Sequence, residues 1–375
     1  MFTATIAPWP PVDFDSARLP WEGVQTVTTD LARVVVGHPY ATRALSSAVD
    51  SGQPSHAYAL HGPAMVGKRT LATAFAQALL CSGDDRPCGE CRSCQDFRRG
   101  AHPDFRLVAP DDGAQSARRG PPPRQTAIGI DVIRDLRLDS VLAPVRSPWR
   151  VYVVPDADRL TAEAMNALLK TLEEPPQHVV LVLAVERLES LLPTIVSRCQ
   201  TLRLGAVPRR ALAEALHERW QVDEERAFEL ASISRGRVGW AIQALAEPEL
   251  PEAREAALER LRVLLRDGTI GRLDVAAHLA EAYGKDRDGI NRLLDEWACW
   301  LRDALFVRLD SADIIAGVDR EADLALAARL VPAVALREAI AAVSTAFDDL
   351  AANVNPRLVF ENLVLSLPKE LAGAS

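Results

Sequence analysis

The sequence predicts an α/β module built on a parallel sheet, followed by all-α regions. Between residues 36 and 204, short apolar runs alternate with helical segments, which is typical of parallel strands covered by helices on both faces. Beyond Pro208 the strand signals disappear and only helical patterns remain. The chain has 375 residues, more than one core usually contains, so two or three domains are expected.

The first part of the α/β module is expected to be helix, strand and helix. Residues 1–35 hold several prolines and predict an irregular extension that ends in a first helix over Val24–Val36. The next expected elements, in chain order, are a helix over Ala41–Val49, a strand over Ala57–Leu60 that ends at Gly62, and a helix over Leu71–Leu80. The last of these repeats apolar residues with few breakers, as a buried helix does.

The second part adds two buried strands. The glycines, prolines and arginines of residues 111–125 cannot build a core and predict an exposed loop or a disordered insertion. An amphipathic helix is expected over Ile130–Leu142, continuously apolar strands over Arg150–Val154 and His178–Val185, and a helix over Thr161–Leu172. Pro175 and Pro176 end that last helix because proline lacks the backbone N–H group.

The remainder of the chain is expected to be helical. Three short helices are expected over Arg209–Trp220, Glu224–Ser232 and Val238–Ala246, followed by longer ones over stretches such as Ala253–Arg266, Asp288–Leu309 and Ala322–Leu350. Breaks are expected near Gly268, Gly284 and Pro332. The predicted organisation is an extension over 1–35, the α/β module over 36–205, a small helical domain over 206–250 and a larger one over 251–375.

Composition excludes several classes of protein. The formal net charge of −8 argues against a chain that binds nucleic acid through its overall charge. Apolar runs such as Val179–Val185 are far shorter than the ~20 residues needed to span a bilayer. The first residues lack the basic and then apolar pattern of a secretory signal, so a cytoplasmic location is expected.

A glycine-rich loop follows the first expected strand. Gly62-Pro-Ala-Met-Val-Gly67-Lys68 lies between a strand and a helix, the context that a phosphate-binding loop requires. Its backbone N–H groups and the helix N-terminus can face phosphate, and Lys68 can reach the outer phosphates. The magnesium-binding Ser or Thr expected next is Arg69 here, with Thr70 one place late. The alternative is an ordinary strand–helix turn that contains glycine.

Four of the six cysteines lie close together in the sequence. Cys81, Cys88, Cys91 and Cys94 fall within fourteen residues, a spacing that suggests a metal site in a reducing compartment. Four soft thiolate ligands can close a tetrahedron around Zn²⁺, and such sites are structural. The alternative is four buried or redox-active thiols. Cys199 and Cys299 lie among apolar residues and are expected in the core.

Several motifs together resemble one family. This chain resembles the bacterial clamp-loader ATPases of DNA polymerase III in the order and spacing of four motifs. These motifs are the loop Gly62–Lys68, the cysteine cluster, Asn166–Pro176 (Asn-Ala-Leu-Leu-Lys-Thr-Leu-Glu-Glu-Pro-Pro) and Ser197-Arg198-Cys199. The similarity covers roughly 36–204, and Asn355–Leu363 is similar to family tails. The resemblance implies an α/β AAA+ P-loop module with a bound zinc ion, an all-α lid domain and an all-α collar domain that packs a ring of five subunits.

Within that resemblance, the positions needed for hydrolysis are altered. Counting back from Asn166 puts Pro155 and Asp156 where active members carry an Asp–Glu pair for magnesium and water activation. The sensor of the next strand falls near Val185 or Glu186, and Gly239 stands where the lid would supply an arginine. Together with Arg69, these changes imply a member that does not hydrolyse ATP. Nucleotide binding at the degenerate loop stays open.

Arg198 is a functional residue of the family that this chain retains. In the family this arginine is a finger that enters the neighbouring subunit's ATP site, where a planar cation stabilises the transferring phosphoryl group. From composition alone, a surface ion pair is the alternative. The resemblance implies gamma/tau and delta subunits as partners, with the sliding clamp and primed DNA reached through the complex and no membrane partner. The competing hypothesis is a gamma/tau-type ATPase, which would need Asp–Glu at 155–156 and Ser or Thr at 69.

Overall fold

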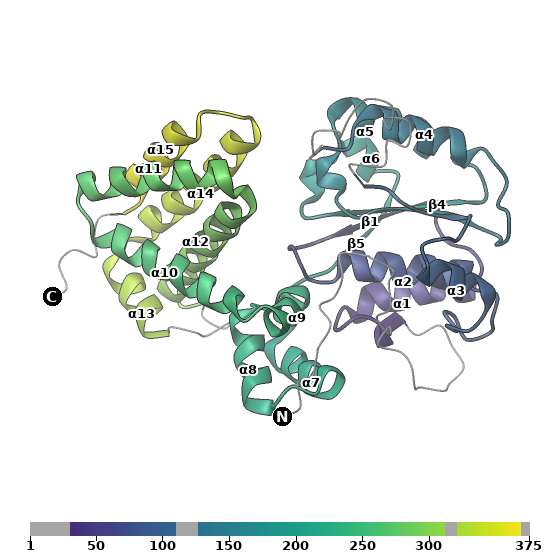
Figure 1. Cartoon of the computed structure of the whole chain (residues 1–375), viewed down its shortest axis with the longest axis horizontal. Helices are drawn as coiled ribbons and strands as arrows, with labels where there is room; N and C mark the ends of the chain where they lie inside the picture. Colours follow the sequence, from purple (N-terminus) through teal and green to yellow (C-terminus); the bar gives the residue numbers. More distant parts are fainter. Residues whose placement is uncertain (1–30, 110–126, 312–320, 369–375) are drawn as a thin grey trace. The chain divides into compact units, whose positions relative to one another are not determined.

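The computed structural model describes residues 31–109, 127–311 and 321–368. The chain divides into two compact units, Met1–Ile242 and Gln243–Ser375. The first contains the sheet and the second is helical throughout its described residues (Figure 1). The predicted extension up to residue 30 and the predicted loop over 111–125 lie outside the described residues. The four-part organisation predicted from the sequence is finer than this division and stays a prediction.

A parallel sheet forms the centre of the first unit. Its strand order is β2-β3-β4-β1-β5. The strands are β1 (Ala57–His61), β2 (Phe105–Leu107), β3 (Arg150–Val154), β4 (Val179–Val185) and β5 (Gln200–Arg203). His61 is in register with both Val185 and Arg203. Since every pairing is parallel, the carboxyl ends of β1, β4 and β5 lie at one edge of the sheet.

Helices cover both faces of this sheet (Figure 1). One face packs against α1 (Pro39–Asp50), α2 (Lys68–Leu80) and α3 (Arg92–Arg98), and the other against α4 (Ile130–Ser140), α5 (Ala162–Glu173) and α6 (Pro193–Val196). Alternate residues of β3 enter different cores, Val151 and Val153 one and Tyr152 and Val154 the other. A strand buried on both faces must be apolar at almost every position, which explains the continuous apolar run.

Most of the expected elements of this module are confirmed. The strand over Arg150–Val154 matches residue for residue, and the expected helices overlap α1, α2, α4 and α5. The expected helix over Val24–Val36 is wrong in its described part, where Leu31–Arg33 forms a single 3-10 turn. His38 adopts a left-handed conformation with φ of 58° and precedes Pro39, which disfavours a continuous helix there. Helix α3 and strand β2 were not expected.

Three short helices follow the sheet, α7 (Arg209–Trp220), α8 (Glu224–Ile233) and α9 (Val238–Ala246). The bounds of α7 and α9 coincide with those expected. The carboxylate of Asp223 begins α8 by accepting hydrogen bonds from the backbone N–H groups of Glu225 and Arg226. Helix α9 contains the division between the two units.

The second unit packs its helices around one apolar core. These helices are α10 (Glu249–Arg266), α11 (Thr269–Lys285), α12 (Arg287–Arg308), α13 (Glu321–Leu330), α14 (Ala333–Ala351) and α15 (Pro356–Ser366). Trp297 is fully buried and its indole N–H donates to the Ala257 carbonyl at 2.8 Å. Buried Arg272 donates to the carbonyl oxygens of Val364, Leu367 and Pro368 and so closes the end of α15.

No single helix of the described residues is both long and apolar enough to cross a membrane. Residues 322–330 and 333–351 are long and apolar enough only when taken together as a pair. The two helices are bent by 110° at the break between them. This break contains Pro332, as the sequence predicts.

Candidate functional site

The glycine-rich loop joins the carboxyl end of β1 to the start of α2. Gly62 has a φ of +150°, and a Cβ at this position would lie 1.8 Å from the Leu204 carbonyl oxygen, so only glycine fits. Helix α2 begins at Lys68, and Arg69 and Thr70 occupy its first turn. The structure therefore brings the predicted loop residues to one helix N-terminus, where free N–H groups can meet an anion.

Lys68 lies beneath this loop and is almost fully buried. Its Nζ donates to two loop carbonyl oxygens, those of Gly62 at 2.6 Å and Pro63 at 2.7 Å. Burial lowers the pKa of Lys68, and the carboxylates of Glu186 and two aspartates that follow β3 oppose this shift. The ammonium group thus fixes the shape of the loop and faces acidic side chains at the ends of β3 and β4.

Pro155 and Asp156 directly follow β3, at the edge of the sheet that also carries the loop. Pro155 is buried and its side chain has no atom that could ligate a metal, whereas Asp156 is exposed. Asp158, which the sequence analysis missed, accepts hydrogen bonds from the Glu186 N–H at 2.8 Å and from the Ser190 hydroxyl at 2.5 Å. This carboxylate therefore ties the end of β3 to the end of β4.

Gly239, in the first turn of α9, contacts the glycine-rich loop. Its N–H donates to the Met65 carbonyl at 2.7 Å, and a Cβ at 239 would lie 3.0 Å from that oxygen. A longer side chain could enter only if Met65 moved. The contact gives a physical reason for glycine at a position where the resemblance leads one to expect arginine.

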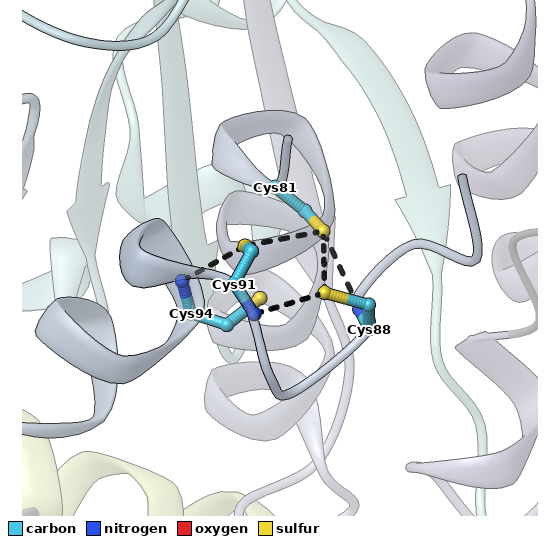
Figure 2. Close-up of side chains that lie close together, drawn as sticks. All are labelled: Cys81, Cys88, Cys91 and Cys94. Atoms are coloured by element: carbon cyan, nitrogen blue, oxygen red, sulfur yellow. Dashed lines mark hydrogen bonds between the residues drawn. The ribbon is translucent and has the colours of Figure 1, made fainter. Parts of the chain in front are cut away.

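The four clustered cysteines converge on one point (Figure 2). Their sulfurs all lie within 4.8 Å of one another. Cys81 follows α2, Cys91 caps α3 and Cys94 lies in its first turn, while Cys88 comes from the loop between them. The Sγ of Cys81 is 3.5 Å from that of Cys88 and 3.9 Å from that of Cys91. Zinc–sulfur bonds of about 2.3 Å in a tetrahedron space the sulfurs about 3.8 Å apart, so the cluster fits a metal of that size.

Backbone N–H groups point at these sulfurs. Cys81 Sγ accepts from the N–H groups of Gly83 and Cys88, and Cys91 Sγ accepts from the N–H of Cys94. A hydrogen bond from the Cys94 thiol and these backbone donors lower the pKa of Cys81 to about 5. The same hydrogen bond and burial raise the pKa of Cys94. The site therefore favours a thiolate, the form that binds metal.

Asp104 anchors the segment that follows the cysteine cluster. This buried carboxylate accepts from three successive backbone N–H groups, those of Val145 at 2.6 Å, Arg146 at 2.8 Å and Ser147 at 2.9 Å. Burial alone would raise the pKa of Asp104, but the three hydrogen bonds outweigh it and lower the pKa. Asp104 thus joins the cysteine-containing segment to the loop that leads into β3.

We expect Asp104→Ala to lower the free energy of unfolding by about 3 kcal/mol, since it leaves three N–H groups without their acceptor. Because folding lowers its pKa, the carboxylate stabilises the fold above its ordinary pKa of about 4, and that contribution begins to be lost below this value and disappears as pH falls through the lower pKa of the folded state. Urea unfolding at pH 7 and at pH 3.5 measures both effects. Asp131→Ala, at a side chain 85% exposed, is the control. Equal losses for the two variants would contradict the anchoring role.

Arg198 lies in the turn between α6 and β5. One Nη donates to the Thr194 carbonyl at 2.9 Å and the other to Glu173 Oε1 at 3.0 Å. The two side chains are 36% and 50% exposed, so the group is reachable from outside the chain. The surface ion pair that the sequence left as an alternative is therefore present, and its partner is the last residue of α5.

The other cysteines differ from expectation. Cys199 and Cys299 are half-buried instead of fully within a core, and burial raises the pKa of Cys199 to about 12. Cys199 packs at the margin of the α4–α6 side of the sheet. Neither belongs to the four-sulfur cluster.

A parallel sheet covered on both faces, with a glycine-rich loop and lysine at the end of β1, defines an α/β P-loop module. A family model described as DNA polymerase III, delta subunit, matches residues 37–208. The delta-prime subunit of DNA polymerase III from Pseudomonas aeruginosa is 33% identical over 271 residues, which cover 70% of this chain and 75% of that protein. The chain belongs to this DNA polymerase III delta-prime family.

Two relatives from Bacillus subtilis allow the delta-prime type to be compared with the tau type. Its DNA polymerase III delta-prime subunit is 28% identical over 330 residues, which cover 88% of this chain and 95% of that protein. Its tau subunit is 27% identical over 357 residues and 89% of this chain, but the chain spans only 60% of the length of that protein. The matches confirm the resemblance drawn from the motifs and favour the delta-prime type over gamma/tau.

Proposed function

We propose that this chain is the non-hydrolysing subunit of a DNA polymerase III clamp loader. In that complex it joins gamma/tau and delta subunits and helps to load the sliding clamp onto primed DNA during replication. It supplies Arg198 in trans to the ATP site of a gamma/tau subunit. The complex acts in the cytoplasm.

The observation that carries this proposal is Pro155 at the end of β3. A magnesium-dependent hydrolase needs a carboxylate at this edge of the sheet to hold the ion beside the phosphates. Proline offers no ligand, and exposed Asp156 is one methylene shorter than the glutamate that would activate water. The contact between Gly239 and Met65 supports the same conclusion, because it occupies the side of the loop that a lid arginine would need.

A gamma/tau-type ATPase is the second candidate. The match to the Bacillus subtilis tau subunit along 89% of this chain and the loop around Lys68 favour it. Arg69 and Pro155 argue against it, since neither can take part in binding magnesium. The delta-prime relatives argue against it as well, because this chain covers 95% and 75% of their lengths but only 60% of the length of the tau subunit.

Reconstitution separates the two candidates. The chain is combined with gamma/tau, delta, the sliding clamp and primed DNA, and DNA-stimulated ATP hydrolysis is measured with and without it. A non-hydrolysing subunit raises hydrolysis by the other subunits and has no activity alone. A complex that loads clamps equally well without this chain contradicts the proposal.

For the isolated chain we expect no ATP hydrolysis above background, because the metal-binding and water-activating positions are Pro155 and Asp156. The measurement is phosphate release at saturating ATP and magnesium. Lys68→Ala serves as the control, since contaminating activity is unaffected by it. Turnover that disappears in Lys68→Ala would contradict the prediction. Nucleotide binding without turnover is compatible with it, because the loop's backbone donors can hold phosphate without a magnesium site.

The proposed cofactor is one zinc ion held by Cys81, Cys88, Cys91 and Cys94. Four thiolates are the ligand set of closed structural zinc sites, which leave no position for water or substrate. When bound, the ion would join the end of α2 to the start of α3 and stabilise the segment between them. The site takes no part in the phosphate chemistry.

A further inference from the structure

The guanidinium group of Arg198 is held from two different elements. The Thr194 carbonyl of α6 accepts from Nη1 at 2.9 Å, and the carboxylate of Glu173, at the end of α5, accepts from Nη2 at 3.0 Å. Ser197 Oγ lies 3.4 Å from Nη1. Contacts on both Nη groups fix the plane of the guanidinium as well as its position.

Stability does not account for this arrangement. Glu173 is 50% exposed and Arg198 is 36% exposed, so water and salt screen their attraction. Exposed ion pairs of this kind change folding stability little. The physical effect of the contacts is to restrict a long side chain that would otherwise sample many rotamers.

The same contacts leave donors for an outside acceptor. A guanidinium carries five N–H groups, and the contacts above use at most three of them. The Nε–H and one Nη2 N–H have no acceptor among the described residues. A phosphoryl oxygen can therefore bind Arg198 while Glu173 and Thr194 still hold it.

We propose that Glu173 is a positioning residue for Arg198, and that it orients the guanidinium toward the phosphoryl group of a neighbouring subunit's nucleotide. This inference rests on the proposed role of Arg198 in trans. A group that must stabilise a transition state acts best when its orientation is fixed in advance, because small misplacements cost much of its effect. In this role Glu173 acts through Arg198 and not by direct contact with the nucleotide.

Glu174 provides a matched control. It is the next residue, it is also exposed, and its side chain makes no hydrogen bond or ion pair among the described residues. Glu173→Gln and Glu174→Gln each remove one negative charge from the end of α5 without changing the size of the side chain. Only Glu173→Gln weakens the charged contact to Arg198.

The test uses the reconstituted complex with five forms of this chain: wild type, Glu173→Gln, Glu174→Gln, Arg198→Ala and the Glu173→Gln/Arg198→Ala double variant. DNA-stimulated ATPase is measured across ATP concentrations, together with thermal unfolding and assembly of each form. We expect Glu173→Gln to lower kcat by about three- to tenfold with KM for ATP nearly unchanged, because orientation matters most in the transition state. Glu174→Gln should match wild type, and the double variant should match Arg198→Ala.

The outcomes separate this inference from the function on which it rests. If Arg198→Ala lowers the rate but Glu173→Gln behaves as Glu174→Gln does, the positioning role fails and the finger role stands. A faster Glu173→Gln complex would mean that Glu173 competes with phosphate, and a further loss in the double variant would mean that it acts elsewhere. Either result overturns the inference. A complex carrying Arg198→Ala that keeps the wild-type rate would refute both the finger role of Arg198 and the positioning role of Glu173.

Discussion

Replacing Arg198 by alanine is expected to lower the ATPase and clamp-loading rates of the reconstituted complex severalfold or more, while the chain still folds and assembles. Arginine fingers in other nucleotide hydrolases contribute on the order of 10³ or more at their own site. The whole complex should lose less, because its remaining sites would be completed by other subunits. The size of the loss therefore measures how much turnover depends on the one site that this chain completes.

Folding should be nearly unaffected by this change. The ion pair between Arg198 and Glu173 is exposed, and breaking such a pair alters the free energy of unfolding by within about 0.5–1 kcal/mol. Arg198→Lys should also be impaired in turnover, because an ammonium group cannot reproduce the planar fork that contacts two acceptors at once. Thermal unfolding and gel filtration of the assembled complex establish that a rate loss comes from the site.

Arg226 offers a control of the same kind. It lies in α8 of the same unit, its side chain is 42% exposed, and it forms an ion pair of 2.6 Å with Glu229. Arg226→Ala removes an equally exposed charge and an equivalent pair, and it should load clamps at the wild-type rate. A complex carrying Arg198→Ala that also loads clamps at that rate would return Arg198 to the role of a surface ion pair.

The sequence allowed prediction of elements whose signal is local. The strands β3 and β4 are buried on both faces, so their continuous apolar runs stood out, and paired prolines marked the end of α5. The glycines and lysine of the loop and the four cysteines were recognisable because their chemistry requires those residues at short spacing. These features allowed the glycine-rich loop and the cysteine cluster to be predicted from the sequence alone.

What the sequence could not provide depends on contacts between distant segments. Strand β2 has only three residues at the edge of the sheet, too few to show a period. Asp104 and the N–H groups that it binds are separated by more than forty positions. Glu173 and Arg198 are 25 positions apart, and nothing in the pattern of either segment indicates that they meet.

Removal of metal from the cysteine cluster is expected to have the largest effect on stability. The purified chain should contain about one zinc ion, bound by Cys81, Cys88, Cys91 and Cys94. Apparent binding free energies of structural zinc sites are about 10–16 kcal/mol in isolated zinc-finger peptides, and much of that energy supports folding. Without the ion, four partly or fully buried sulfurs would have no common partner. A strong chelator should therefore loosen the segment between α2 and β2 without unfolding the helices of the second unit.

Cys94→Ser tests the same site by mutation, because Cys94 is fully buried and hydroxyl oxygen is a poor replacement for thiolate. We expect it to lower zinc content and the unfolding temperature, whereas Cys299→Ser, outside the cluster, should retain zinc. Acid should release the ion as well, since protons compete with zinc for the thiolates. Metal analysis, thiol titration and amide hydrogen exchange measure these effects. A native chain without zinc, or with all four thiols freely titratable, would leave the cluster as buried thiols with no metal.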